Sequence, residues 1–401
     1  MGRVTAYADR FSALRPPAEE DFTSPLRSAA VAARVGLWLG ICFGLAFLTG
    51  LISHWAQEPD AWLPFPTRPT WGYRVTQGLH VVIGVAAIPL LLVKLWTVFP
   101  KLFARPPRGL RRVVLEVGER GSIGVLVGAA IFQLASGLAN SAQWYPWDFR
   151  FRSTHYAMGW IAVGALALHI AIKLPVIRTA LGEPVDSSTL DREGADPVAS
   201  IAPGALDRRG LVRTALLAAG VAVIATAGST VPLLRRISVL GVRSGDGPGG
   251  IPINKSARAA DVVASALSPD YRLTVTFGAN SRVFTREELA ALRQTSRELP
   301  IACVEGWSAS GRWSGVRLRD LLDLVEAPRE RAVRITSLQQ RGPYRATELP
   351  AQFADDPSTL LALTLDDEPL ALDHGYPCRL IAPNRPGVLQ TKWVTDVEVL
   401  A

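Results

Sequence analysis

A cysteine stands at the end of a β-prone run in the C-terminal part of the chain. Leu299–Ala302 lead into Cys303, and Gly306, Trp307 and Ser308 follow at once. A strand that ends in this way can deliver one soft ligand to the rim of a pocket, because glycine lets the backbone pass close to a large group. The alternative is a buried structural cysteine, which is the commoner environment of a free thiol.

A second motif lies further along the chain, in the run from His374 to Leu380 and the segment from Pro383 to Trp393. Together with Cys303–Ser308 it resembles sulfite-oxidase-type molybdopterin-dependent oxidoreductases, and among them the branch of the periplasmic methionine-sulfoxide reductases. The resemblance covers most of residues 251–401. It implies a molybdenum ion held by the Cys303 thiolate and by the dithiolene of a single molybdopterin.

The same resemblance implies that Arg385 and Lys392 bind the terminal phosphate of the pterin, which needs cations and backbone donors. Leu389 departs from the pattern, since relatives often carry another lysine there. The alternative for both cations is a solvated surface. Several other side chains stay open between substrate binding, pocket wall, core and surface, and no catalytic acid or base is assigned among them: Trp307, Trp313, Arg312, Arg341, Arg345, Tyr344 and His374.

The three cysteines exclude a disulfide framework and a multi-cysteine iron–sulfur site. A disulfide between Cys303 and Cys378 would remove the metal ligand, so it stands as an alternative to the molybdenum site. Cys42 falls within an apolar segment and is interpreted as a packing residue.

The C-terminal region, residues 245–401, has the pattern of an α+β domain. Thr285 and Glu288 form a capping box that opens a short helix. An amphipathic helix is predicted over Val316–Val325, and a Gly/Pro-rich tether at Ser244–Gly250 precedes the domain. Strands are predicted at Tyr271–Phe277, Ala332–Ser337, Leu360–Leu365, Cys378–Ala382 and Thr391–Leu400.

Composition indicates that the rest of the chain enters a lipid bilayer. Apolar residues make up 49% of the 401 residues, and the mean hydropathy is +0.20. The net charge of +8 falls mainly beside apolar runs, which argues against nucleic-acid binding. Five segments are long enough to span: Val35–Ser53, Gly78–Trp96, Gly121–Ser141, His155–Leu174 and Leu211–Leu233.

Basic residues gather before the first span, between the second and third, and after the fourth, whereas the loops around 54–77 and 142–154 are rich in aromatic residues. By the positive-inside rule the N-terminus is cytoplasmic, and an odd number of spans places the C-terminal domain outside the cell membrane.

Intramembrane histidines are functional candidates because an imidazole in lipid needs a partner. His80 and His155 each begin a span that runs inward, so both are expected near the outer surface, where they suit axial ligation of one haem b. Residues 30–180 resemble the di-haem membrane subunits of the formate-dehydrogenase gamma kind. The resemblance supports the outer haem, but His54 lies at the wrong end of its span to complete an inner haem with His169. Helix-end histidines are the alternative for all four.

An arginine pair, Arg208–Arg209, directly precedes the fifth apolar segment. It resembles a twin-arginine export signal in an internal position, and ordinary positive-inside anchoring is the alternative. The twin-arginine route moves folded domains, which suits a domain that acquires its cofactor in the cytoplasm.

These patterns predict a multidomain protein: a cytoplasmic segment (1–34), an all-α four-helix membrane bundle (35–180), a cytoplasmic linker (181–209), a fifth span (210–235) and an extracytoplasmic molybdopterin domain (245–401). The predicted function is that of a membrane-bound oxidoreductase performing oxygen-atom transfer on a small molecule and exchanging electrons through haem b with quinone. The alternative is an inactive anchored binding or assembly module that retains the fold. Neither the substrate nor the direction of electron flow follows from the sequence.

Overall fold

The computed structural model describes residues 17–58, 65–104, 109–192, 194–241 and 250–400. The chain divides into two compact units, which are described separately. The first comprises residues 1–44, 84–135 and 153–222, and the second comprises residues 45–83, 136–152 and 223–401. The predicted tether at Ser244–Gly250 lies, except for its last residue, outside the described residues.

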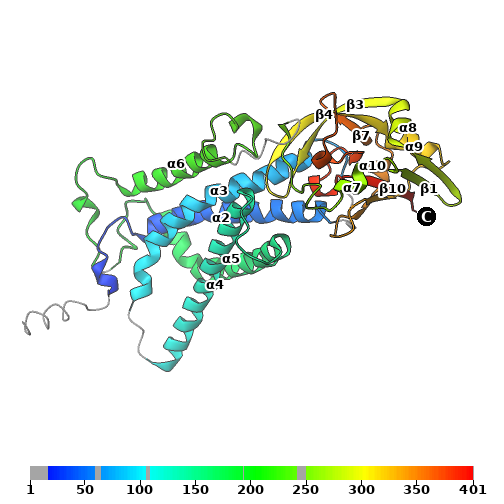
Figure 1. Cartoon of the computed structure of the whole chain (residues 1–401). Helices are drawn as coiled ribbons and strands as arrows, with labels where there is room; N and C mark the ends of the chain where they lie inside the picture. The colour runs from blue at the N-terminus through cyan, green and yellow to red at the C-terminus, as the bar shows by residue number, and fades with distance from the viewer. Residues whose placement is uncertain (1–16, 59–64, 105–108, 193, 242–249, 401) are drawn as a thin grey trace, which may run out of the picture. The chain divides into compact units, whose positions relative to one another are not determined.

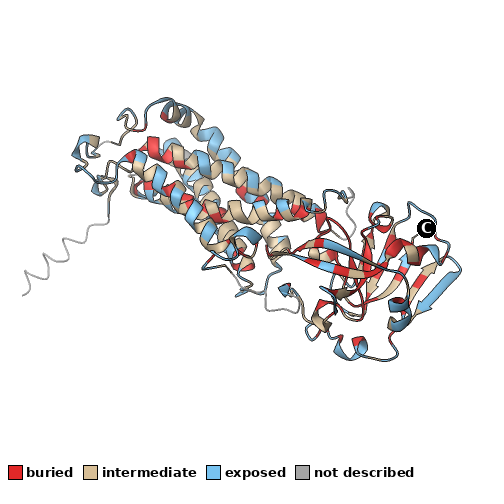
Figure 2. Ribbon diagram, turned by 90° about the horizontal axis from the view of Figure 1, so that it is seen from above, coloured by how far each residue is buried: buried red, intermediate tan, exposed pale blue. Residues whose placement is uncertain are grey.

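Five helices are long and apolar enough to cross a membrane, as their length and composition show: α2 (Ala29–Ala56), α3 (Gly72–Val98), α4 (Leu110–Ser141), α5 (Phe151–Gly182) and α6 (Arg208–Thr226). Figure 2 shows mainly intermediate and exposed residues along them, whereas buried residues concentrate in the strands. Exposed large apolar side chains on a helix are explained by a lipid environment. The arrangement of four helices as a bundle stays a prediction.

The predicted bounds of the fifth span were wrong at one end. Helix α6 stops at Thr226 rather than continuing to Leu233, and Pro232 begins a separate 3-10 turn, Pro232–Leu234. Gly228 interrupts the apolar run, and a Cβ atom there would lie 2.5 Å from the Ser238 side chain that packs over it. Glycine and proline both disfavour a continuing helix.

Two five-stranded sheets form the α+β region, as predicted, and Figure 1 shows their strands in yellow to red. The first has the order β2 (Asn280–Phe284), β1 (Leu273–Phe277), β10 (Val394–Val399), β5 (Val333–Ser337) and β6 (Ala346–Leu349), with β1 and β10 parallel. The second joins β3 (Gln294–Ala302), β4 (Ser308–Arg317), β7 (Leu360–Leu365) and β8 (Glu368–Pro369), and β9 (Arg379–Ile381) also pairs with β7.

Short helices connect the strands: α7 (Val263–Ala266), α8 (Arg286–Ala291), α9 (Leu318–Asp323) and α10 (Ala351–Ala354). The capping box before α8 is confirmed, since the Thr285 hydroxyl accepts from the Glu288 amide at 3.1 Å and the Glu288 carboxylate accepts from the Thr285 amide at 2.8 Å. Helix α9 begins two residues later than predicted, because Val316 and Arg317 still pair with β7.

The two largest hydrophobic clusters of the described residues lie in the sheet region. The larger contains the leucines of α9 and residues of both sheets. The second surrounds Cys303, Trp307 and Trp313. Strands β4 and β7 approach so closely that a Cβ atom on Gly315 would lie 2.0 Å from the Leu361 carbonyl oxygen. This close contact fixes β4, and therefore the turn before it, against the core.

Candidate functional site

Cys303 follows β3 directly, and a tight turn returns the chain into β4. The Gly306 amide donates to the Cys303 carbonyl at 3.0 Å, and the Cys303 amide donates to the Trp307 carbonyl at 3.0 Å. Gly306 has a φ of +88°, a conformation that residues with a side chain rarely adopt. The turn Cys303–Trp307 thereby holds the thiol at the end of a rigid hairpin.

The Cys303 side chain lines a pocket of roughly 330 Å³, part of which is open to solvent. Three separate segments form the wall of the pocket: residues 251–254, the strand end and turn around Cys303, and the C-terminal segment 373–392. The lining residues are Ile251, Pro252, Ile253, Asn254, Ile301, Cys303, Trp307, Asp373, His374, Arg379, Gly387 and Lys392. The structure therefore brings together the thiol and Lys392, two of the predicted site residues.

The environment of Cys303 disfavours a free thiolate. The residue is 1% exposed, and burial, together with the nearby Glu305 carboxylate, raises the pKa of the Cys303 thiol well above its usual range. Coordination to a metal ion deprotonates a thiol outright, so a metal would reverse this preference. Among the described residues there is no group of three or more His, Cys, Asp or Glu side chains that could hold a metal ion. Cys303 is the cysteine that lines the pocket, so it is the soft ligand available to a metal bound there.

Lys392 enters the pocket from the segment before β10. Its ammonium group donates to the carbonyl oxygens of Lys255 and of Asp373, the latter at 3.0 Å. Burial and the Arg379 charge lower the pKa of Lys392 to about 7. An anionic group in the pocket would favour the charged form of this lysine.

Two further side chains leave polar atoms without a partner in the described part of the chain. The His374 ring binds the Ile251 carbonyl through Nε2 at 3.0 Å, which places the hydrogen on Nε2 and leaves Nδ1 as an unpaired acceptor. Arg379 donates from Nη1 to His374 O and from Nη2 to Gln390 O, but its Nε has no partner. Both residues are at most 3% exposed. Buried polar atoms are normally paired, so two unpaired atoms on residues that line one pocket suit a bound ligand.

The residues present fit a molybdenum–molybdopterin group. Cys303 offers a soft ligand, His374 Nδ1 offers an acceptor, and Arg379 Nε and Lys392 offer donors with positive charge. A pterin carries both donors and acceptors on its rings and a phosphate at its end, so one molecule can satisfy all of them. Arg379 falls within the His374–Leu380 motif but was not predicted as a site residue, and the fold places it in the pocket with Cys303.

Arg385, the other predicted phosphate ligand, is not among the residues that line this pocket. Its guanidinium donates to the carbonyl oxygens of Leu389 at 3.2 Å and Glu348 at 2.7 Å, and it lies over the Phe353 ring. Its described contacts thus hold the segment around Leu389 against β6. Leu389 itself is a buried core residue.

The remaining open residues fall into distinct environments. Trp307 belongs to both the core and the pocket wall, whereas Trp313 is a fully buried core residue. Arg312 pairs with Asp367 at the surface. Arg341 and Arg345 are exposed. Tyr344 is half-buried and accepts a hydrogen bond from Arg152.

Cys303 and Cys378 are both free in the structure. They belong to different hydrophobic clusters, and the Cys378 sulfur lies 3.2 Å from the Tyr271 hydroxyl. Burial raises the pKa of Cys378 to about 11. These surroundings are those of a structural core cysteine.

The two predicted haem ligands, His80 and His155, belong to different units of the chain. His80 lies on α3 within the second unit, where its Nδ1 donates to the Ala46 carbonyl at 2.8 Å. This contact puts the hydrogen on Nδ1, the tautomer that a ligand acting through Nε2 requires. His155 lies on α5 within the first unit, so the pairing stays a prediction. His54 lies 3.3 Å from Glu58, and His169 lies on α5 in the first unit.

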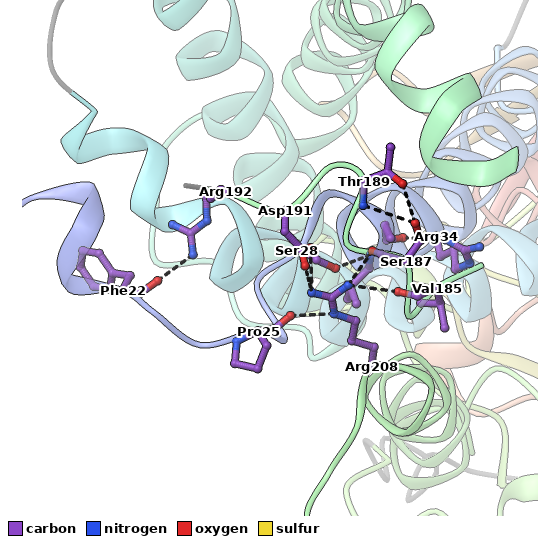
Figure 3. Close-up of polar contacts among 12 residues, drawn as sticks. Phe22, Pro25, Ser28, Arg34, Val185, Ser187, Thr189, Asp191, Arg192 and Arg208 are labelled. Atoms are coloured by element: carbon purple, nitrogen blue, oxygen red, sulfur yellow. Dashed lines mark hydrogen bonds and ion pairs between the residues drawn. The ribbon is translucent and has the colours of Figure 1, made fainter. Parts of the chain in front are cut away.

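The arginine pair lies in the first unit, at the start of α6. Arg208 is fully buried and its guanidinium binds the carbonyl oxygens of Pro25, Val185 and Ser187 and both carboxylate oxygens of Asp191, at 2.7 and 2.8 Å (Figure 3). Arg209 is largely exposed and pairs with Asp186 at 2.8 Å. The two arginines of the predicted export signal therefore have very different surroundings in the folded protein.

The family comparison agrees with the pocket. Residues 260–401 match the model of the oxidoreductase molybdopterin binding domain. The C-terminal region is therefore similar in sequence to molybdopterin-binding domains of oxidoreductases.

Three relatives illustrate the match. The chain is 31% identical over 162 residues to mitochondrial sulfite oxidase of Drosophila melanogaster, covering 32% of this chain and 27% of that protein. It is 31% identical to a candidate protein-methionine-sulfoxide reductase subunit, YedZ1, of Azospira oryzae (33% and 50%). It is 34% identical to the protein-methionine-sulfoxide reductase catalytic subunit MsrP of Xanthomonas campestris (28% and 38%). The chain thus spans half or less of the length of these relatives.

Proposed function

We propose that this protein is a membrane-bound molybdenum oxidoreductase that transfers an oxygen atom to or from a small substrate outside the cytoplasm. The observation that carries the proposal is the pocket in which the Cys303 thiol, the unpaired His374 Nδ1 and the unpaired Arg379 Nε meet. Both kinds of relative carry names of redox enzymes, one of a sulfite oxidase and the other of a methionine-sulfoxide reductase.

In this proposal each pocket residue has a defined task. Cys303 provides the protein thiolate to molybdenum, and Trp307 excludes water from one side of it. His374, Arg379 and Lys392 orient the pterin through their unpaired or charged nitrogen atoms. When bound, the molybdenum–molybdopterin group supplies two-electron oxygen-atom chemistry.

The proposal includes a haem b held by His80 and His155 near the outer membrane surface, which would pass electrons singly between the pocket and the quinone pool. The Nδ1–H contact of His80 with the Ala46 carbonyl supports the ligand role of this residue. The arginine distribution supports a cytoplasmic N-terminus and an exported C-terminal domain.

Metal and haem analysis of one purified sample tests the proposal. The protein from a native host is expected to contain close to one molybdenum, and a Cys303→Ser variant is expected to lose it. A wild-type value below about a tenth of an equivalent would leave the alternative, an inactive binding or assembly module with the same fold. Cys378→Ser is the matched control, because this thiol lies in the core and its loss leaves the pocket intact.

The haem is tested independently by the reduced-minus-oxidised spectrum. We expect a b-type band in the wild type that disappears in both His80→Ala and His155→Ala. His54→Ala serves as the control, since this histidine lies beside Glu58 and is not a proposed ligand. A band that survives the His80→Ala change would remove His80 as a ligand.

A further inference from the structure

The Cys303–Trp307 turn also contacts residues that do not line the pocket. Within the second unit, it contacts the C-terminal end of α4 and the loop that follows it. The Asn140 side-chain amide donates to the Val304 carbonyl at 2.9 Å, and the Gln143 side-chain amide donates to the Glu305 carboxylate at 2.8 Å. A segment between two predicted membrane spans thereby binds the residues next to the proposed metal ligand.

Tyr145 links these contacts into one network. Its hydroxyl donates to the Asn140 side-chain oxygen at 3.0 Å and lies 3.4 Å from Glu305 Oε1. Asn140 is 5% exposed, so water is hardly available as an alternative hydrogen-bond partner for its amide. With its donor on Val304 and its acceptor on Tyr145, the Asn140 side chain is oriented by both partners.

Glu305 explains why such a network is needed. Its Oε2 lies 3.9 Å from the Cys303 sulfur, so the carboxylate would face the thiolate that binds the metal. Two like charges at this distance repel each other unless donors stabilise them. The Trp307 indole at 3.0 Å and Gln143 supply those donors, and both bind the same oxygen, Oε2.

The turn also has no room to move away from the pocket. A Cβ atom on Gly306 would lie 2.9 Å from Val81 and 3.3 Å from the Ser141 hydroxyl. From α3, the Gln77 side-chain amide approaches the Val304 carbonyl at 3.4 Å. Packing and hydrogen bonds from α3, α4 and the loop after α4 therefore act on the three residues that follow Cys303, namely Val304, Glu305 and Gly306.

We infer that Asn140, Gln143 and Tyr145 form a positioning site that fixes the Cys303 thiol from the membrane-helix side of the turn. These three residues lie outside the molybdopterin-binding domain. They touch neither substrate nor metal, and they position the thiol through their contacts with Val304 and Glu305. The identity of the metal rests on the proposed function. The positioning of the Cys303 thiol is independent of the proposed function and can be measured in protein without the cofactor.

The test uses the full-length chain in detergent, prepared from a host that cannot make molybdopterin. The rate at which iodoacetamide alkylates Cys303 is measured by peptide mass spectrometry in the wild type, Asn140→Leu, Gln143→Leu and Tyr145→Phe. Asn280→Leu is the matched control, because the Asn280 amide also donates to a backbone carbonyl, that of Val325, at 3.1 Å, far along the chain from the turn. Holoprotein from a normal host is analysed in parallel for molybdenum content and for the Mo(V) resonance spectrum.

We expect Asn140→Leu to accelerate alkylation of Cys303 on the order of tenfold, since the loss of a buried hydrogen bond makes local opening easier by about that factor. Tyr145→Phe, which removes one hydroxyl and leaves packing intact, is expected to give a smaller acceleration in the same direction. In the holoprotein, these variants are expected to alter the Mo(V) spectrum, whereas Asn280→Leu leaves it unchanged.

Alkylation at the wild-type rate in all three variants would overturn the inference, as would an equal acceleration in Asn280→Leu. A wild-type protein without molybdenum would refute the proposed function instead, and the alkylation rates would still decide whether α4 positions the thiol.

Discussion

Two buried arginines show how differently the same side chain is used in the two units of this protein. Arg208, in the first unit, is 0% exposed and directs Nε and both terminal nitrogens to carbonyl and carboxylate oxygens. Arg379, in the second unit, is 3% exposed and leaves Nε without a partner beside a pocket. The protein's own oxygen atoms satisfy the first cation, whereas the second keeps one donor that no described residue accepts.

The comparison gives a criterion for separating a structural cation from a ligand-binding one. An unpaired nitrogen is not sufficient by itself, because Arg27 has two such atoms and its guanidinium stacks on the Trp96 ring. At Arg379 the unpaired donor coincides with an unpaired acceptor on His374, a buried thiol and a pocket that all three line. That coincidence, rather than burial alone, indicates a binding site.

The largest effect is expected from Arg208. Its Asp191 partner is 16% exposed, so removing the guanidinium leaves a largely buried carboxylate and several carbonyl oxygens without a donor. Breaking a buried ion pair by removing one partner costs about 3–5 kcal/mol. We expect Arg208→Met to make the segment around residues 183–207 rapidly cleavable by protease in detergent, compared with the wild type.

Arg209→Met is the control for this experiment, because an exposed pair such as Arg209–Asp186 contributes no more than about 1 kcal/mol. Single lysine substitutions extend the comparison to export. If the pair acts as a twin-arginine signal, Arg208→Lys and Arg209→Lys should both hinder the appearance of the C-terminal domain outside the cell. An effect of Arg208→Lys alone would assign the pair to folding rather than to export.

A second comparison, between Arg379 and Arg385 of the C-terminal domain, tests whether an unpaired donor beside a pocket marks a ligand-binding cation. Arg379→Met removes the unpaired donor from the pocket, and the loss of a charged hydrogen bond should weaken retention of molybdopterin by about 10- to 100-fold. Arg385→Met removes contacts to Leu389 and Glu348 instead and is expected to lower stability while leaving the cofactor content per folded molecule near that of the wild type. Pterin fluorescence after acid release and molybdenum analysis provide the measurement; equal losses in the two variants would contradict the distinction.

Local patterns in the sequence predicted the features that depend on neighbours along the chain. The capping box at Thr285, the strand Leu360–Leu365 and the apolar helices were recovered because each follows from side chains within a few residues. The glycine- and tryptophan-containing surroundings of Cys303 predicted a residue at a pocket, and Cys303 lines one, while its role as a metal ligand stays a prediction. The end of α6 was missed, because an apolar composition masked the effects of Gly228 and Pro232.

The pocket could not be completed from sequence, since its wall joins segments that lie over a hundred residues apart, from Asn254 to Lys392. Arg379 and Arg385 have similar neighbours along the chain, since both lie close to a proline and to apolar residues. The local sequence therefore does not show that Arg379, and not Arg385, keeps an unpaired donor. Their difference arises from tertiary contacts: Arg385 donates to the Glu348 carbonyl at β6, whereas Arg379 Nε has no acceptor among the residues that the structure describes. Tyr145 was interpreted as part of an interfacial aromatic loop, and its contact with Glu305 appears only in the fold.

The smallest expected effect concerns pH and also comes from the pocket. Burial, together with the positive charge of Arg379, lowers the pKa of His374 to about 4, while Lys392 adds to this and Asp373 opposes it. An unfolded chain binds this proton near pH 6.5, so the unfolded state binds more protons than the folded state between about pH 4 and 6.5. Stability should therefore be fully present above pH 6.5 and decline as the pH falls. For cofactor-free protein we expect a loss of about 1–2 kcal/mol between pH 7 and pH 5, measured by denaturant unfolding in detergent. His374→Gln should remove that part of the pH dependence, and an unchanged difference between the two pH values would exclude His374 as its source.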